Sequence, residues 1–229
     1  MDGDWTPPRT NGYAIELWVQ ADLPSPQAFG QTALVSLIDR EVNKNEKHVA
    51  YLELTSRGRR SPHEPCAVRF LDRWPAAVSG GADLFSRRTF VPSLWHHLVG
   101  QKRGDTLELY VDGERVGTSP VKLNTQGAED ESTTGPCRLI VGRLKRRSTP
   151  PHADEIRAFE GRLDELVVYD RPLFPYEIRR HVWLRALGGA PCDPLRNPAA
   201  RLAPRPLICP PEPGHNVARD SYASRFLSR

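Results

Sequence analysis

Residues 106–117 read Thr-Leu-Glu-Leu-Tyr-Val-Asp-Gly-Glu-Arg-Val-Gly, and this stretch decides the fold class. Apolar and polar residues alternate before Asp112-Gly113, which is typical of a strand with one buried face. Glycine tolerates the positive φ that a two-residue hairpin turn needs, so Asp-Gly between two apolar runs predicts a hairpin. The stretch therefore predicts two antiparallel strands joined by a tight turn.

Similar short runs, rich in β-branched and aromatic residues, lie on both sides of this hairpin and are bounded by turn residues. The predicted strands cover 13–20, 33–38, 48–54, 67–74, 95–101, 106–111, 115–117, 138–141 and 162–169. Many short strands at regular spacing are typical of an antiparallel β-sandwich or jelly roll. The absence of a βαβ rhythm disfavours a parallel α/β sheet. The sequence therefore predicts an all-β fold.

One short helix is predicted at 175–185, because proline and glutamate stand in its first turn and arginine in its last. The residues after it, 186–229, contain eight prolines, six arginines and little periodicity. We therefore predict a jelly-roll domain over 1–185 and an irregular or wrapping Pro/Arg-rich tail over 186–229.

Composition excludes several classes of protein. Of the 229 residues, 38% are hydrophobic and 26% are charged, which is ordinary for a globular protein. The basic residues behind the net charge of +4 are scattered in short clusters, so we predict no nucleic-acid partner.

No apolar run reaches about 18 residues, so no membrane insertion is predicted. Residues 1–8 lack the pattern of a secretory signal peptide, which favours a cytosolic protein or a piece of a larger one.

Four segments in order resemble the laminin-G-like branch of the concanavalin A-like lectin/glucanase superfamily. They are Tyr-Ala-Ile-Glu-Leu-Trp-Val (13–19), Trp-His-His-Leu-Val (95–99), the hairpin at 107–117, and Phe-Glu-Gly-Arg-Leu-Asp-Glu-Leu-Val-Val-Tyr-Asp-Arg-Pro-Leu (159–173). The resemblance implies a jelly roll of two curved antiparallel sheets. It also implies recognition of glycans or proteins outside the cytoplasm, in many members with a calcium ion at the rim.

Two further segments, 68–75 and 137–144, resemble laminin-G-like domains at the C-terminal end of bacterial FecR-like regulators. That resemblance implies an accessory domain of a larger protein, acting in the periplasm or at the cell surface.

The carboxylates do not predict an enzyme. Glucanases need two carboxylates on one sheet face, and the pattern Glu-x-Asp-x-Glu is absent. Asp164 and Glu165 are adjacent, so we expect them to point to opposite faces of a strand. No Gly-x-Ser-x-Gly motif is present for a serine hydrolase.

Alternation along a strand also bears on Trp95-His96-His97. Adjacent imidazoles face opposite sides and do not share one metal ion. We expect Trp95 and His97 to pack inward with Trp18, as core residues, and His96 to face outward or border a groove.

The resemblance implies a calcium ligand at Asp164, because the family often uses the aspartate of its closing strand. Asp2 and Asp4 are candidate partner ligands, since the first and last strands are usually neighbours. Calcium prefers six to eight oxygen ligands. The alternative is that Asp164 hydrogen-bonds a neighbouring turn.

Candidate ligand-binding residues are Arg73 and Trp74, at a strand end that leads into Gly80-Gly81, together with Arg59 and Arg60 in a basic loop. An exposed aromatic ring beside polar groups is typical of a glycan site. The alternative for Trp74 is a structural role, and for the basic loop a solvated hairpin tip.

The four cysteines show no zinc-site spacing. Cys66 and Cys137 both follow a proline and open strands, so they form a disulfide if those strand ends are neighbours; Cys192 and Cys209 would pin the tail in the same way. Buried thiols are the alternative.

The function we expect is non-catalytic recognition of a polysaccharide or a protein surface. The alternative function is a structural or assembly subunit that oligomerises through the sandwich and the tail.

Overall fold

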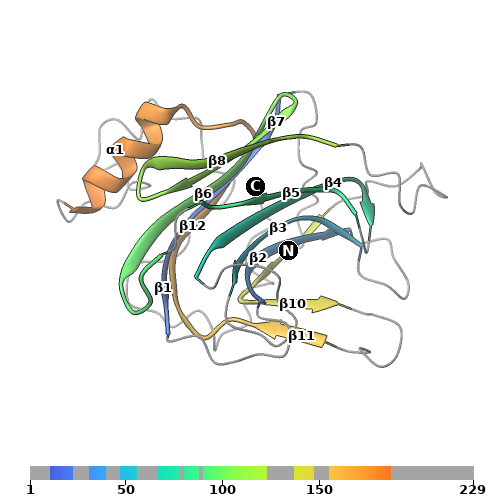
Figure 1. Cartoon of the computed structure of the whole chain (residues 1–229), viewed down its shortest axis with the longest axis horizontal. Helices are drawn as coiled ribbons and strands as arrows, with labels where there is room; N and C mark the ends of the chain where they lie inside the picture. Colours follow the sequence, from blue (N-terminus) through green and yellow to red (C-terminus); the bar gives the residue numbers. More distant parts are fainter. Residues whose placement is uncertain are drawn as a thin grey trace.

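The computed structural model describes residues 11–22, 31–39, 47–55, 66–77, 80–87, 90–122, 137–146 and 155–186. These residues form two five-stranded sheets, a two-stranded hairpin and a helix (Figure 1). The predicted all-β antiparallel sandwich with one short helix is confirmed. The predicted boundary between a domain and a tail at 185/186 stays a prediction, because residues 187–229 lie outside the described residues.

The first sheet joins strands from distant parts of the sequence. Its order is β12 (Gly161–Tyr169), β1 (Tyr13–Ala21), β6 (Trp95–Arg103), β7 (Thr106–Val111) and β8 (Glu114–Pro120). All neighbouring strands in it are antiparallel. Asp112 and Gly113 both have positive φ, of 52° and 82°, so the β7–β8 hairpin has the turn that Asp-Gly predicts.

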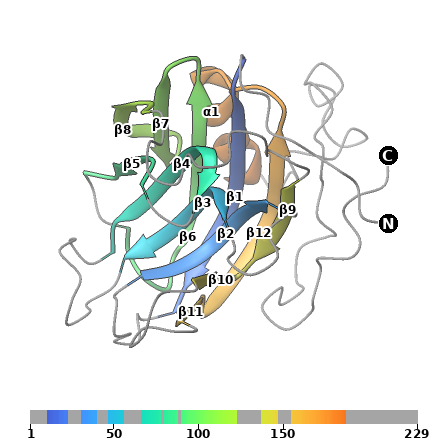
Figure 2. The same cartoon turned by 90° about the vertical axis from the view of Figure 1, so that its right-hand side faces the viewer.

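The second sheet faces the first. Its order is β5 (Ala82–Phe85), β4 (Val68–Ala77), β3 (His48–Thr55), β2 (Gln31–Asp39) and β9 (Cys137–Val141). Figure 2 shows this sheet in front, with the first sheet and the helix behind it. The hairpin of β10 (Arg143–Arg146) and β11 (Glu155–Ala158) lies against the outer face of β2, where Leu144 packs with Ala33, Tyr51 and Leu71.

The main core lies between the sheets. Inward side chains of both sheets form it, among them Ile15, Leu17, Leu52, Phe70 and Leu98, all fully buried. The sheets approach closely at Gly100, where a Cβ atom would lie 2.6 Å from Cδ2 of Phe70. Close packing of this kind is what makes interior positions sensitive to added volume.

The helix α1 (Pro175–Ala186) packs on the outer face of the first sheet. Its Ile178 and the preceding Leu173 are buried against a second apolar cluster formed by Ala14, Val99, Tyr110, Val167 and Tyr169. Glu177 accepts a hydrogen bond from the backbone N–H of Phe174 at 2.7 Å, which satisfies a donor at the start of the helix. Among the described residues, no helix combines the length and apolar character that crossing a membrane requires.

Candidate functional site

Side chains alternate along β1, and this alternation builds the outer face of the first sheet. Ile15, Leu17 and Val19 point into the core, so Glu16, Trp18 and Gln20 point outward toward α1 and solvent. On this face, a group of buried titratable side chains lies under α1.

Glu16 is the centre of that group. Its Oε1 accepts hydrogen bonds from Nε2 of His97 at 2.7 Å and Nδ1 of His181 at 2.8 Å, and its Oε2 accepts one from the hydroxyl of Tyr169 at 2.6 Å. Burial works to raise the pKa of Glu16, but the charge and hydrogen bond of His181 and those of His97 outweigh it and lower that pKa. Glu16 therefore stays ionised under the helix.

A β-bulge places two carboxylates beside each other next to this centre. The register of β12 against β1 shifts between the partners of Glu16 and Trp18, and Glu165 has a φ of 48°. Asp164 and Glu165 consequently both reach Arg185 of α1, each at 2.8 Å. The expectation that they point to opposite faces is wrong, because it assumed a regular strand.

The guanidinium of Arg185 covers this bulge and bonds both of its carboxylates. The guanidinium carbon of Arg185 lies 5.7 Å from the centre of the Trp18 ring. The centres of the Trp18 and His97 rings are 5.1 Å apart. Burial raises the pKa of Glu165 to about 7 although Arg185 acts in the opposite direction. Within the described residues, Trp18 Nε1, His97 Nδ1 and Glu165 Oε2 are buried without a hydrogen-bond partner.

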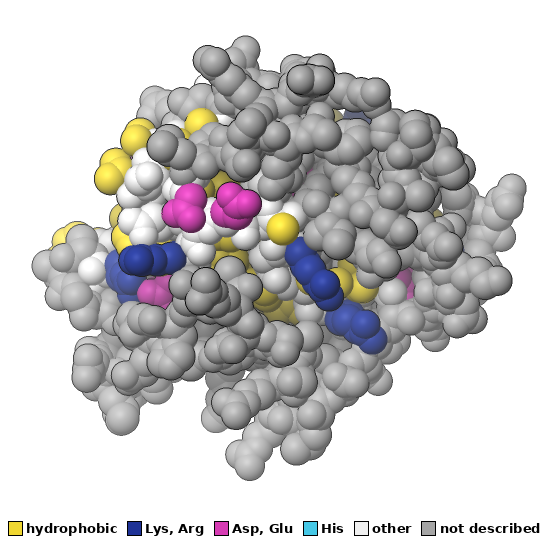
Figure 3. Space-filling model, turned by 90° about the horizontal axis from the view of Figure 1, so that it is seen from below, with side chains coloured by type: hydrophobic (Ala, Val, Ile, Leu, Met, Phe, Trp, Pro, Cys, Tyr) yellow, Lys and Arg dark blue, Asp and Glu magenta, His cyan; other side chains and the backbone are white. Residues whose placement is uncertain are grey.

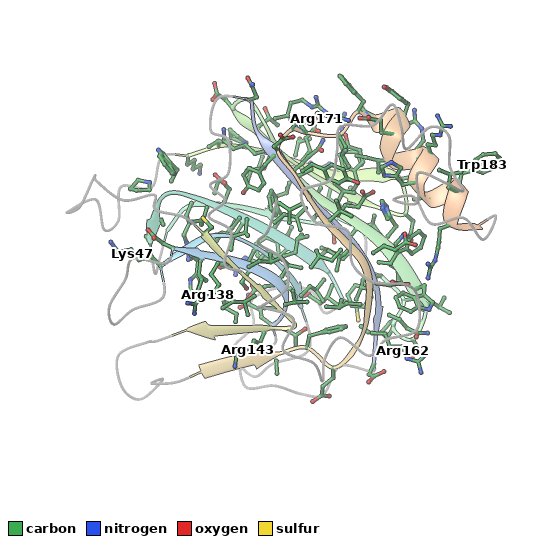
Figure 4. The ribbon with its side chains drawn as sticks, turned by 180° about the vertical axis from the view of Figure 1, so that it is seen from behind. Lys47, Arg138, Arg143, Arg162, Arg171 and Trp183 are labelled. Carbon is green, nitrogen blue, oxygen red and sulfur yellow. The ribbon has the colours of Figure 1, made fainter. Side chains whose placement is uncertain are left out.

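The outer face is open just beyond the end of α1. Gln20 pairs with Arg162 on one side and with Trp95 on the other, so the three side chains form one row across β12, β1 and β6. Trp95 is 36% exposed and Arg162 is exposed. Figure 4 shows Arg162 at the lower end of the sheet, away from α1. The amide Nε2 of Gln20 donates to the Ser93 carbonyl at 2.8 Å, which fixes its orientation.

The placement of the Trp-His-His segment corrects the sequence expectation. Trp95 and His97 lie on the outer face, not in the core between the sheets; His97 is fully buried there, bonded to Glu16 and packed on the Trp18 ring. His96 points to the other face, where its Nδ1 bonds Asp112 Oδ2 at 2.7 Å. The sequence gives no direct sign of which sheet face a strand presents to the core when both faces are covered.

The predicted ligand residues lie elsewhere. Arg73 is 5% exposed; its Nε donates to the Gly80 carbonyl at 2.7 Å and its Nη1 to the Ala77 carbonyl at 3.1 Å. Trp74 is half-buried and precedes a cis peptide bond to Pro75.

Arg73 also joins a polar cluster on the outer face of the second sheet. Its guanidinium carbon and that of Arg69 lie 5.5 Å and 5.1 Å from the Tyr51 ring centre. Arg69 pairs with Glu53 at 2.9 Å and Asp83 at 2.6 Å. These contacts give Arg69 and Arg73 a structural role in the second sheet. The ligand role of Arg73 and Trp74 stays a prediction, and Arg59 and Arg60 lie outside the described residues.

The surroundings of Asp164 do not fit a calcium site. Its Oδ1 accepts the Glu165 backbone N–H at 2.9 Å, and its Oδ2 accepts the Arg185 guanidinium. A cation would have to displace that positive group. Asp2 and Asp4 lie outside the described residues, and no group of three or more metal-binding side chains occurs within them. The calcium site that the resemblance implies is therefore untested, and the contacts of Asp164 favour the alternative of a structural hydrogen-bonding role.

The two described cysteines lie at opposite ends of β2. Cys137 pairs with Asp39, while Cys66 bonds the backbone of Thr55, which pairs with Gln31. Eight residues of strand separate these ends, about 26 Å. Cys66 and Cys137 are not joined to each other, because the premise that their strand ends are neighbours is wrong. Cys192 and Cys209 lie outside the described residues.

The chain is similar to several solved structures and matches one family model. Among solved structures, the chain is similar to the native heptameric SAP-like pentraxin from Limulus polyphemus, with 12% identity, a TM-score of 0.49, and coverage of 77% of this chain and 72% of the pentraxin chain. It is also similar to the Ruminococcus gnavus IT-sialidase CBM40 bound to α2,3 sialyllactose, with 14% identity, a TM-score of 0.47, and coverage of 76% and 83%. Curated protein sequences give no match. The family model of the concanavalin A-like lectin/glucanases superfamily matches residues 3–179, and the chain belongs to this superfamily.

Proposed function

We propose that this protein is a non-catalytic module that binds carbohydrate on the exposed row formed by Trp95, Gln20 and Arg162. The observation that supports it is the register of β12, β1 and β6, which brings an exposed indole, an amide and a guanidinium onto one face. Membership of a lectin-like superfamily supports a binding role of this general kind.

The row has the chemistry that a sugar needs. The indole of Trp95 offers an apolar surface for the face of a pyranose ring, while Gln20 and Arg162 offer hydrogen bonds to hydroxyl oxygens. Neighbouring strands are about 4.8 Å apart, so the row spans about 10 Å from Trp95 to Arg162. That length suits one or two sugar units.

A non-catalytic role is supported by the state of the nearest carboxylate pair. Asp164 and Glu165 are both bonded to Arg185, and Glu165 is buried. General acid–base work needs a carboxylate within hydrogen-bond reach of the substrate. Among the side chains that Figure 3 colours, both Asp/Glu and Lys/Arg appear on the same face, which differs from the single-sign surface typical of nucleic-acid binding.

The proposal extends to location. We infer an accessory role outside the cytoplasm, as part of a larger protein, because the segments at 68–75 and 137–144 resemble laminin-G-like domains of FecR-like regulators. Cell fractionation with an antibody to this protein tests the location directly.

Glycan-array screening of the full chain, followed by calorimetry with the best glycan, tests the binding proposal. We expect Trp95→Ala and Arg162→Gln each to weaken binding at least about tenfold, or about 1.4 kcal/mol. Trp183→Ala is the matched control, since Trp183 is an exposed tryptophan on α1 away from the row. Equal binding by wild type and Trp95→Ala would contradict the site. Release of sugar from the bound glycan would contradict the non-catalytic role.

A further inference from the structure

The helix α1 carries a second face that the sheet does not use. Its inner face consists of Ile178, His181, Val182 and Arg185, spaced i, i+3, i+4 and i+7. The residues Tyr176, Arg179, Arg180 and Trp183 repeat the same spacing on the outward side, where the stem of Arg179 borders the β7–β8 turn at Gly113 while the residue stays exposed. Apart from Pro175, these four are the exposed residues of the described helix. Side chains at this spacing share one face of a helix.

The outward face is apolar and strongly exposed at both ends. Tyr176 is 61% exposed and Trp183 is 60% exposed, although both are large. Figure 4 shows Trp183 pointing away from the sheet. Two helical turns separate the two rings, about 10 Å along the axis. Isolated exposed aromatics are ordinary, but two at anchor spacing on one face are typical of a docking helix.

The N-terminal end of this face is held in place by contacts within the chain. Phe174 stacks on Tyr176 with ring centres 5.7 Å apart and an angle of 11° between the ring planes. Arg171 lies 5.9 Å from the Phe174 ring centre and makes two hydrogen bonds to Glu177, at 2.8 Å and 2.6 Å. A pre-ordered anchor loses little conformational entropy when it binds.

The charges on this face indicate the kind of surface that it binds. Arg179 and Arg180 make no ion pair with any described residue, whereas Arg171 and Arg185 of the same region have carboxylate partners. The face itself contains no carboxylate. Two arginines between two aromatics therefore fit a surface that is apolar in the middle and acidic at its rim.

We propose that the outward face of α1 docks a second protein, which receives Tyr176 and Trp183 in an apolar groove and pairs acidic rim residues with Arg179 and Arg180. A sugar is the poorer fit, because the face is convex and its hydrogen-bonding groups are almost all donors. The docking face is separate from the row at Trp95, so the two surfaces bind independently.

Site-specific photo-cross-linking tests the proposal. The full chain carrying Trp183→p-benzoylphenylalanine is produced in the cells that naturally make it and irradiated, and the cross-linked protein is identified. That protein is then purified, and its affinity is measured for wild type, Trp183→Ala, Arg179→Glu/Arg180→Glu and Trp95→Ala. We expect the Trp183 variant to bind about 30-fold more weakly, as is usual for a hot-spot residue. The charge reversal should weaken binding at least tenfold and remove most of its salt dependence.

Trp95→Ala should bind the partner as wild type does, and Trp183→Ala should still bind glycan. Equal melting temperatures show that the variants remain folded, since the substituted side chains are exposed. The proposal is overturned if the cross-link falls on residues 187–229 of the same chain or on a second copy of it, or if no protein is cross-linked. It is also overturned if the charge reversal leaves the affinity unchanged. Loss of glycan binding in Trp95→Ala is a separate result that bears only on the carbohydrate proposal.

Discussion

His181 on α1 donates from Nδ1 to Oε1 of Glu16 on β1, at 2.8 Å. This hydrogen bond joins the helix to the outer face of the first sheet, and Glu16 is 4% exposed. The charges and hydrogen bonds of His181 and His97 lower the pKa of Glu16, so the carboxylate stays ionised.

Glu16→Gln keeps the shape of this side chain but removes its charge. The donors around it then lose a charged acceptor in a buried setting. We expect the free energy of unfolding to fall by about 3 kcal/mol, the usual cost of breaking a buried pair. Urea unfolding measures it. Glu160→Gln is the control, since Glu160 is exposed, and it should change stability by less than about 0.5 kcal/mol.

Stability should fall as pH rises through neutrality. Burial raises the pKa of Glu165 from 4.5 to about 7. Burial works to lower the pKa of His181, but the charge and hydrogen bond of Glu16 outweigh it. The pKa of His181 is therefore raised above 6.5. Both groups bind a proton more tightly in the folded chain, so stability is lost from pH 4.5 to 7 for Glu165 and from pH 6.5 upward for His181. The slope is at most about 1.4 kcal/mol per pH unit for each group.

Urea unfolding at pH 5, 6, 7 and 8 measures that slope. Glu165→Gln should flatten the profile below pH 7. His181→Gln should reduce the slope above pH 6.5 without abolishing it, because the hydrogen bond of Asp112 also raises the pKa of His96. A wild-type stability that increases over this range would show that the sign is wrong.

Tyr13→Phe tests the polar contact between the two sheets. The Tyr13 hydroxyl donates to Oδ1 of Asp72 at 2.7 Å, and both residues are fully buried. Loss of a hydrogen bond to a buried carboxylate should lower the free energy of unfolding by about 2 kcal/mol. Tyr176→Phe removes a hydroxyl from a tyrosine that is 61% exposed and should leave stability unchanged. Similar effects of the two changes would mean that the Asp72 contact contributes little.

Calcium binding at Asp164 is open to a direct measurement. Arg185 already neutralises this carboxylate, so we expect wild type to melt at the same temperature in calcium and in EDTA. A bound ligand at 100 times its dissociation constant would instead stabilise the fold by about 2.7 kcal/mol, a shift of several degrees. A calcium-dependent rise that Asp164→Asn abolishes would restore the calcium site.

Most strands could be predicted from the sequence because their signals are local. The strands β1, β7 and β12 lie within two residues of their expected bounds, and β8 runs three residues beyond its expected end. The strands β5, β10 and β11 were not predicted. Each has four residues, too few to show a period of two, and the apolar contact of Leu144 comes from another strand.

The open row at Trp95 could not be predicted in the same way. Arg162, Gln20 and Trp95 are far apart in sequence and meet only through the pairing of β12, β1 and β6. Their exposure depends on where α1 ends, which is a property of tertiary packing. The bulge at Glu165 is likewise invisible in the sequence, because a glutamate with positive φ has no local signature.

The first and last strands of the two large sheets lie side by side. Ala14 of β1 is opposite Tyr169 of β12, and Ala21 is opposite Gly161. The chain therefore enters and leaves the sandwich within one strand spacing, about 5 Å. Beyond Tyr169 the chain does not leave the molecule but continues into α1, which covers the outer face of these two strands. The two ends of the described chain are therefore brought to one sheet, and the helix is held only once β1 and β12 have paired.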